Sequence, residues 1–119
     1  MKLGRKISGG KYQARRKRKL YERPGQGKVT KLGEEKRKVS KVTGGNRKSY
    51  LLKAQSINLI SKGKSRRATI TNVLETPSNR FLARQNILTK GTIVETDKGK
   101  AKITNRPTQE GVVNGILVE

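Results

Sequence analysis

The stretch "GTIVETDKGKAKITN", residues 91–105, places β-branched residues on both sides of the turn "DKGK". This pattern predicts a β-hairpin with Gly99 in the left-handed conformation, which glycine adopts without steric cost. The next segment, "RPTQEG", predicts another turn, and it leads into the apolar run "VVNGILVE". The C-terminal part of the chain is therefore expected to consist of short strands joined by polar turns.

The same pattern extends towards the N-terminus. The runs "KSYLLKAQSINLI" (48–60) and "ATITNVLET" (68–76) have strand character and are separated by the turn "KGKS". One helix-like segment, "PSNRFLARQ" (77–85), has Ser78 as the expected cap and Phe81, Leu82 and Ala83 as apolar contacts. Strands spaced at about ten residues predict an all-β barrel or sandwich with at most one short helix.

The chain is strongly basic. It has 30 Lys and Arg against eight Asp and Glu in 119 residues, for a formal net charge of +22. A compact domain with this charge repels itself, so a polyanionic partner is expected, and nucleic acid is the commonest one. A membrane surface is the weaker alternative. We expect no membrane partner, because the sequence has no apolar run of about 18 residues and "MKLGRKISGG" lacks a signal peptide's apolar core.

Residue types also exclude several classes of chemistry. Cys and His are absent, which excludes disulfide scaffolds, zinc sites and thiol or imidazole nucleophiles. The close acidic pairs, Glu34–Glu35 and Glu95/Asp97, are better explained by charge balance than by acid–base catalysis. We therefore expect no catalytic residues, no metal or other cofactor and no small-molecule substrate.

Aromatic side chains are scarce: Tyr12, Tyr21, Tyr50 and Phe81 are the full set. Sheet proteins that read single strands stack bases on several rings, and one of these four rings is expected in the core. Binding should therefore depend on phosphate, sugar and shape rather than on unstacked bases.

Charge and apolar residues are unevenly distributed. Residues 1–49 hold 18 basic and three acidic residues, a net charge of +15, whereas residues 50–119 carry +7. Only 11 apolar or aromatic residues occur in the first stretch, against 25 in the second. The first part cannot offset an ordering entropy of about 1–2 kcal/mol per residue by burial. We predict a basic arm at residues 1–36 and a small β-barrel domain at residues 37–119.

The arm contains "ARRKRK" (14–19), with five consecutive cations. Such a run can be a solvated charge cluster or a localisation signal. The overall charge and the preceding "SGGK" favour an arm that orders along a nucleic-acid backbone. The following "RPGQGK" (23–28), with one proline and two glycines, should not be crossed by a helix.

The stretch "VTGGNRKS" (42–49) is glycine-rich but is not a nucleotide-binding loop. The one Gly-Lys-Ser, at residues 63–65, has Asn58 where a phosphate-binding loop requires glycine. We predict a tight turn in which the lack of Cβ atoms lets backbone N–H groups approach phosphate, with Arg47 and Lys48 adding charge.

Two other turns, "TKG" (89–91) and "NRP" (105–107), place a cation beside a turn residue. The candidate RNA-binding residues are thus Arg5, Lys6, Gly9, Gly10, Lys11, Arg15, Arg16, Lys17, Arg18, Lys19, Arg37, Lys38, Gly44, Gly45, Asn46, Arg47, Lys48, Lys90 and Arg106.

Seven motifs in order resemble the archaeal branch of the eukaryotic-type small-subunit ribosomal protein eight family. They are "SGGKY", the following Lys/Arg cluster, "GEEKRK", "GGNRK", "NILTKG", "GKAKITNRP" and "GVVNGIL", and they cover about Gly4 to Glu119. Gly44-Gly45-Asn46 matches the family's signature turn, and Gly9-Gly10 matches its N-terminal one. The chain departs from the family at Tyr50, Leu51 and Leu52, where the family is typically richer in arginine, and "YERPGQGKVTK" follows it loosely.

The resemblance implies a small β-barrel with a basic arm, a structural and non-enzymatic component of the small subunit. The expected partners are small-subunit ribosomal RNA and neighbouring ribosomal proteins, the expected location is the cytoplasmic ribosome, and the free chain is expected to be monomeric. The alternative is a chromatin or nucleoid protein on duplex DNA, and a secreted heparin-type binder is third. Few wedge-type apolar residues on turns favour folded RNA over bent duplex DNA.

Overall fold

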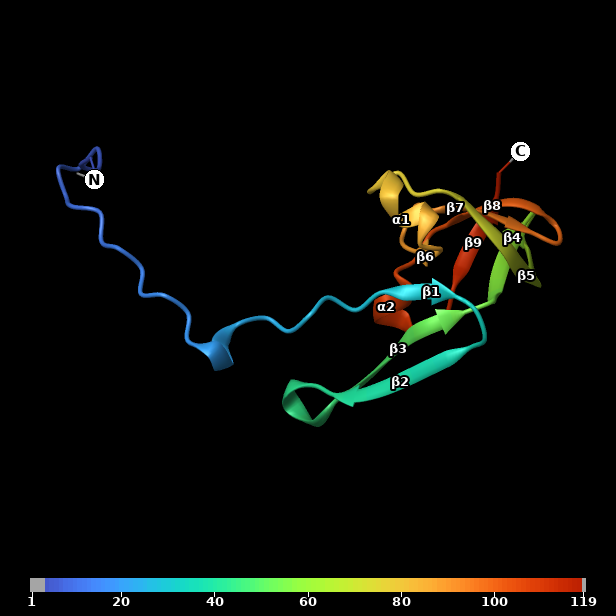
Figure 1. Cartoon of the computed structure of the whole chain (residues 1–119), viewed down its shortest axis with the longest axis horizontal. Coiled ribbons are helices and arrows are strands. Elements are labelled where there is room, and N and C mark those ends of the chain that lie inside the picture. The colour runs from blue at the N-terminus through green and yellow to red at the C-terminus, as the bar shows by residue number, and fades with distance from the viewer. Residues whose placement is uncertain (1–3, 119) are drawn as a thin grey trace.

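The protein has an extended N-terminal segment and a β-rich body. The computed structural model describes residues 4–118, in which residues 4–29 run away from the body and residues 30–118 form it (Figure 1). The radius of gyration is 20.2 Å, whereas a compact domain of this length has one of about 13–14 Å. The extended segment accounts for the difference. We call residues 4–29 the arm.

The described body contains two sheets and two short α-helices. Its strands are β1 (Thr30–Leu32), β2 (Lys36–Lys41), β3 (Arg47–Ala54), β4 (Ser56–Ser61), β5 (Lys64–Glu75), β6 (Ile87–Leu88), β7 (Ile93–Thr96), β8 (Gly99–Ile103) and β9 (Asn114–Leu117). Its helices are α1 (Arg80–Arg84) and α2 (Pro107–Glu110), and single 3-10 turns occur at η1 (Leu20–Glu22) in the arm and η2 (Thr43–Gly45) in the body.

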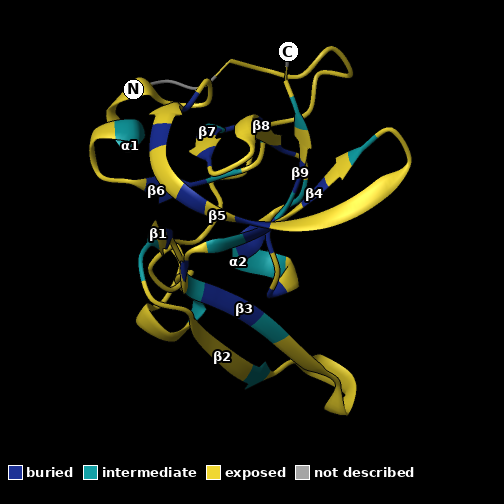
Figure 2. Ribbon diagram, turned by 90° about the vertical axis from the view of Figure 1, so that its right-hand side faces the viewer, coloured by how far each residue is buried: buried dark blue, intermediate teal, exposed yellow. Residues whose placement is uncertain are grey.

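Strands β4, β5, β7, β8 and β9 form a closed barrel, which confirms the all-β barrel prediction. Strand β4 pairs with β5, β5 with β7, β7 with β8 and β8 with β9, and all four pairs are antiparallel. Strand β4 closes the barrel by pairing in parallel with β9. Alternation fills the interior: Ile57 and Leu59 of β4 are buried, while Asn58 between them is exposed. Figure 2 shows buried stretches in β3 and β5 and a mostly exposed β2. The backbone of Gly115 approaches β4 so closely that a Cβ atom there would lie 2.8 Å from Cδ1 of Ile57.

The second sheet has the strand order β2-β3-β1-β6. Strand β1 lies inside it, parallel to β3 and antiparallel to β6. The Thr30 hydroxyl is buried and donates a 2.7 Å hydrogen bond to the carbonyl of Leu51. Residues 30–32, which the sequence placed in the arm, are thus a strand of the body. Leu51 and Leu88 of this sheet pack in the same hydrophobic core as the barrel residues.

The helical segments differ from expectation in three respects. Asn79, not Ser78, caps α1, because its side-chain oxygen accepts a 3.0 Å hydrogen bond from the Phe81 N–H. Phe81 is 60% exposed and supplies no core contact; the buried ring is Tyr50, which is 5% exposed. The predicted turn "RPTQEG" contains a second helix, α2, so the described structure has two short α-helices rather than at most one. Proline in its first turn and Gly111, at a φ of 65° after its end, suit a one-turn helix.

A candidate nucleic-acid interface

The arm begins with an ordered loop rather than a simple extended chain. The Lys6 N–H donates a 2.9 Å hydrogen bond to the carbonyl of Gly10, and the Gly9 N–H donates one of 2.9 Å to the carbonyl of Lys6. Arg5 pairs with Lys11 across the loop, and its guanidinium donates a 3.0 Å hydrogen bond to the carbonyl of Gly9. Gly9 has a φ of 79°, which explains a glycine there. The loop therefore holds Arg5, Lys6 and Lys11 together on an exposed backbone turn.

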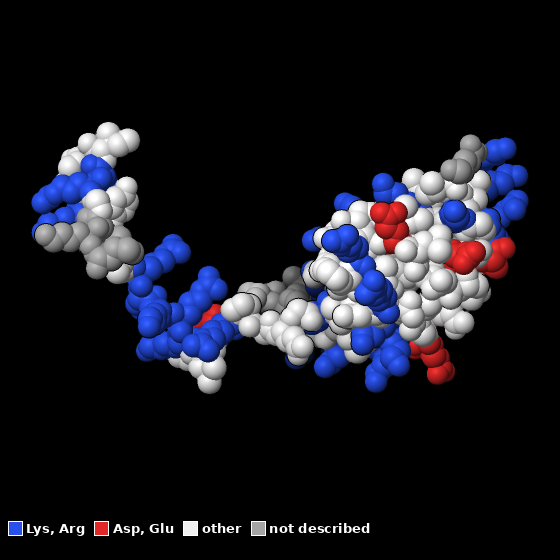
Figure 3. Space-filling view, turned by 45° about the horizontal axis from the view of Figure 1, so that its top comes forward, with Lys and Arg blue, Asp and Glu red and all other residues white. Residues whose placement is uncertain are grey.

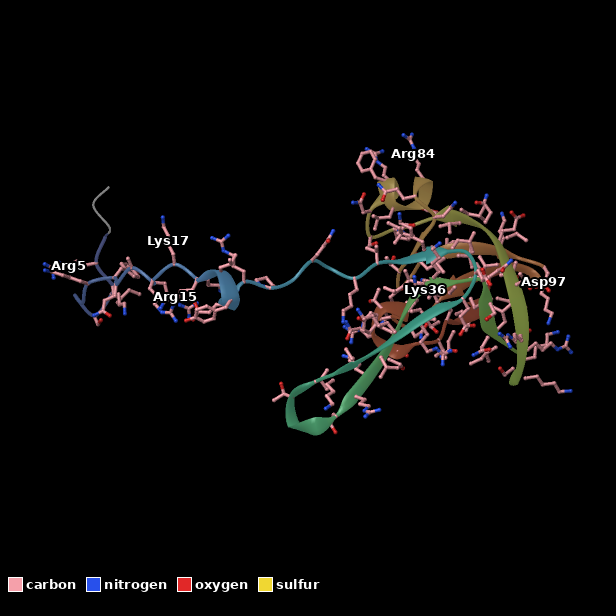
Figure 4. The ribbon with its side chains drawn as sticks, turned by 60° about the horizontal axis from the view of Figure 1, so that its bottom comes forward. Arg5, Arg15, Lys17, Lys36, Arg84 and Asp97 are labelled. Carbon is pink, nitrogen blue, oxygen red and sulfur yellow. The ribbon has the colours of Figure 1, made fainter. Side chains whose placement is uncertain are left out.

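All five residues of the basic run Arg15–Lys19 are exposed, and Arg15 and Lys17 project from opposite sides of the arm (Figure 4). Glu22 in η1 folds back on this run: Arg16 donates hydrogen bonds to its two carboxylate oxygens at 2.9 and 2.5 Å. The hydrogen bond from Arg16, and next that from the Lys19 N–H, lower the pKa of Glu22, and the same contact raises the pKa of Arg16. The single acid in the described arm is thus held by one arginine of the run.

The β2–β3 hairpin projects from the body and carries the "GGN" turn at its tip (Figure 1). Gly44 and Gly45 have φ values of 81° and 76°, as predicted for a turn that requires glycine. Asn46 has a φ of −70°, so it is not left-handed; its carbonyl closes the turn by accepting a 2.8 Å hydrogen bond from the Val42 N–H.

Cations face cations along this hairpin. Lys41 lies directly opposite Arg47, and Lys36 lies opposite Lys53. Like charges in directly opposite positions destabilise an isolated hairpin. A polyanion lying along the hairpin would remove that repulsion, so the hairpin is a candidate surface for nucleic acid. The predicted Arg37, Lys38 and Lys48 are exposed on the same hairpin, and Lys48 donates a hydrogen bond to Gln109 of α2.

The predicted cations Lys90 and Arg106 are brought together in a groove, although 16 positions separate them. Both line a cavity of about 370 Å³ in which Lys28, at the base of the arm, is the third cation. The rest of its wall is mostly apolar and comes from β6, α1 and the start of α2, including Leu82, Ile87 and Pro107. We call this cavity the arm-base groove. The sequence predicted two of its cations as separate turn contacts and did not predict that they converge.

A further group of cations was not predicted. Lys62, Lys64, Arg66 and Lys98 surround a hollow of about 570 Å³ at the edge of the barrel, with Leu59 and Leu117 in its wall. We call these four residues the barrel-edge cluster. The sequence carried a signal for it, because "KGKSRR" (62–67) holds four cations in six residues. That segment was interpreted as a turn, and the turn is present, with Lys62 and Gly63 at φ values of 47° and 75°.

Few carboxylates compete for these cations. Among the described residues, ion pairs within 4.0 Å join Arg16 to Glu22 and Glu35 to both Arg37 and Arg67. Figure 3 shows basic side chains along the arm and over the body, with acidic ones few and scattered. Asp97, expected to serve charge balance, accepts a 3.2 Å hydrogen bond from the Thr69 N–H. Residues 4–118 contain neither a group of three potential metal-ligating side chains nor a helix long and apolar enough to cross a membrane.

Comparisons with known proteins agree with this arrangement. The family model of ribosomal protein S8e matches residues 1–118. The chain belongs to the ribosomal protein S8e family. It is 44% identical to small ribosomal subunit protein eS8 of Nanoarchaeum equitans over 117 residues, which cover 97% of this chain and 92% of that protein. It is 40% identical to the protein of the same name from Methanocella arvoryzae over 119 residues, covering 98% and 95%.

The S8e match confirms the family resemblance inferred from the seven motifs. It includes both the arm and the body, so the basic arm lies within the family's own extent. All 19 predicted RNA-binding residues are exposed on three parts of this S8e chain: the arm, the β2–β3 hairpin and the rim of the arm-base groove. Their contacts with RNA remain a prediction.

Proposed function

We propose that this chain is a structural protein of the small ribosomal subunit that binds and stabilises folded ribosomal RNA. The observation that supports this most directly is a family match over nearly the whole chain, joined to basic surfaces on which few described cations have a carboxylate partner. As a member of a structural ribosomal family, the chain is not an enzyme. Its place is the ribosome, and we extend this to a cytoplasmic ribosome with other ribosomal proteins as neighbours and a monomeric chain before assembly.

The geometry divides the binding task between the arm and the body. The arm offers cations on an extended, exposed backbone, which we expect to be mobile in the free protein and able to follow a phosphate chain, and it buries no apolar side chain. The β2–β3 hairpin and the barrel-edge cluster offer cations on hydrogen-bonded strands and on the tight turns that join them, so their spacing is fixed. Mobile charge supplies affinity without selecting a target, whereas charge at fixed spacing matches one folded backbone. The arm should therefore contribute most of the salt dependence and the body most of the preference.

Competition at physiological salt tests this function. The full chain is bound to a structured fragment of small-subunit ribosomal RNA and challenged with excess duplex DNA or excess unlabelled fragment. We expect displacement by the fragment and retention against DNA. If 6–10 phosphates are neutralised, affinity should fall about 10³–10⁵-fold between 50 and 200 mM salt. Equal displacement by DNA and by the RNA fragment would contradict the proposal, and so would failure of the chain to co-sediment with small ribosomal subunits.

A further inference from the structure

The arm-base groove differs in character from the other basic surfaces. Its volume of about 370 Å³ lies within the range of about 300–1,000 Å³ found for small-molecule sites. Val29, which is 46% exposed, and the half-buried Leu82 give it an accessible apolar wall, and the buried Ile87 and Pro107 join this wall to the body. Phosphate oxygens alone gain nothing from an apolar cavity. The groove is therefore suited to a ligand with an apolar part as well as an anionic part.

The side-chain charges that line the groove indicate that its ligand is negatively charged. Lys28, Lys90 and Arg106 line the groove, and no described carboxylate is part of its wall. The three side chains come from the base of the arm, the turn after β6 and the residue that precedes α2, so they approach the groove from separate segments. A buried apolar side chain from a protein partner would not need three cations around it. A nucleotide has both required parts, a base for the cavity and phosphates for its rim.

We propose that the arm-base groove holds one unstacked nucleotide of the ribosomal RNA, with its base against Val29 and Leu82 and its flanking phosphates near Lys28, Lys90 and Arg106. This rests on the proposed RNA-binding function and adds to it a site for a single extruded base. The scarcity of aromatic rings did not predict such a contact. Removing a base from a stack costs less at a bulge or loop, where stacking is already incomplete, so the ligand is a nucleotide from such a site. The hydroxyls of Ser78 and Thr108, also in the wall, supply hydrogen-bonding groups for the base edge.

Isolated ligands test the groove directly. Backbone amide resonances of the full chain are followed while each of the four nucleoside 5′-monophosphates, inorganic phosphate or N-acetyl-leucinamide is added. We expect at least one nucleotide to shift the amides of Val29, Ile87, Thr89 and Thr108 saturably, with a dissociation constant on the order of millimolar. Inorganic phosphate should need at least about tenfold higher concentration, because it lacks a base.

Three variants complete the design. Ser78→Leu narrows the groove without changing its charge and should abolish the saturable amide shifts that a nucleotide causes. Lys90→Ala with Arg106→Ala should raise the half-saturating concentration at least about tenfold, because charge-assisted contacts are lost. Lys100→Ala with Lys102→Ala removes the same charge from β8, outside the groove, and should leave the half-saturating concentration unchanged. For the ribosomal RNA fragment, Ser78→Leu should lower affinity at an unchanged salt slope, since no phosphate contact is removed.

The results separate this inference from the function on which it rests. Binding of the RNA fragment without saturable shifts by any nucleotide would overturn the single-nucleotide site and leave the ribosomal function intact. Equal binding of phosphate and nucleotides would overturn it in favour of a phosphate site, and saturation by N-acetyl-leucinamide alone would overturn it in favour of a protein neighbour. Loss of binding to the RNA fragment itself, by the unaltered chain, would contradict the proposed function.

Discussion

The ammonium nitrogen of Lys28 lies 3.6 Å from the centroid of the Tyr50 ring. Tyr50 is buried in β3 and Lys28 is among the last residues of the arm, so this contact joins the exposed segment to the body. Two positions later, the buried Thr30 hydroxyl is bonded to the carbonyl of Leu51. The arm is thus fixed at its base by a cation on an aromatic face and a buried hydrogen bond.

Replacing Lys28 should loosen the arm base without unfolding the body. Cation–π contacts at exposed sites contribute about 0.5–1 kcal/mol, so we expect Lys28→Gln to lower the free energy of unfolding by that amount. Amide relaxation measured on the free protein should show greater motion at Gln26 and Gly27. Lys28→Arg, which keeps a cation for the ring, is the matched control. Equal motion in Lys28→Gln and Lys28→Arg would show that the Tyr50 contact does not hold the arm.

Two truncations should differ sharply, because β1 lies between β3 and β6. Deleting residues 1–28 should leave a folded body with strongly reduced affinity for ribosomal RNA. Deleting residues 1–36 also removes β1, its pairing on both edges and the buried Thr30 bond. The second truncation should cost at least about 3 kcal/mol more in the free energy of unfolding. Thermal unfolding compares them, and equal melting temperatures would show that β1 contributes nothing to the body.

Two substitutions at the tip of the β2–β3 hairpin should separate the effect of backbone strain from the effect of a lost RNA contact. Gly45 has a φ of 76°, and a Cβ atom there would meet nothing within 4 Å. The cost of Gly45→Val is therefore conformational, about 1–3 kcal/mol, and Gly45→Asn should cost less because Asn tolerates positive φ. Arg47→Ala should instead weaken RNA binding and leave stability unchanged, or raise it slightly, because Arg47 faces Lys41. A Gly45→Val protein with unaltered melting would be inconsistent with this turn geometry.

Glu22 should act as an internal competitor for RNA phosphate. It holds Arg16 in the free protein, so Glu22→Gln should release that guanidinium and steepen the salt dependence of RNA binding by up to about 0.9 in log–log slope. Glu34→Gln, which removes an equal charge outside the arm, is the control. A steeper slope in Glu34→Gln than in Glu22→Gln would contradict the competition.

The same contact has a definite pH dependence. Because Arg16 lowers the pKa of Glu22 in the folded arm, the contact is fully present above the ordinary Glu pKa and is lost as the pH falls through the lowered value. Carboxyl NMR titration should show a higher Glu22 pKa in Arg16→Gln and no change in Arg15→Gln. An equal rise of the Glu22 pKa in both variants would show that the summed charge of the basic run, and not the contact with Arg16, lowers it.

Two features of the sequence predicted the barrel: the alternation of apolar and polar residues in the strands, and the glycines at the turns. Both depend only on residues that are close together in the sequence. Ile57 and Leu59 flank an exposed Asn58, and Gly44, Gly45 and Gly99 occupy positive φ as their turns require. The sequence also contained the signals for α2, since Pro107 and Gly111 stand at the positions that favour the start and end of a helix. The prediction of a plain turn at "RPTQEG" was therefore wrong because these two signals were not used, not because the sequence lacked them.

Long-range pairing could not be predicted in this way. Strand β1 is only three residues long, and "TKL" shows no period that separates it from the polar segment around it. It becomes a strand because β3 and β6 supply partners on both sides. The arm-base groove has the same origin: Lys28 and Arg106 lie 78 positions apart, and only the closed fold brings them to one cavity.

Strand β2 ends the second sheet, so within residues 4–118 one of its edges has no strand beside it. Such an edge can add a strand from another molecule and begin aggregation, and natural proteins discourage this with charged side chains, lysine above all. Four of the six β2 residues are Lys or Arg, so two molecules that met edge to edge would repel each other. The charges assigned to RNA would then keep newly made, unassembled protein in solution. The repulsion between β2 edges would weaken once bound RNA neutralises their charges. By then the protein is bound to RNA and no longer at risk of self-association.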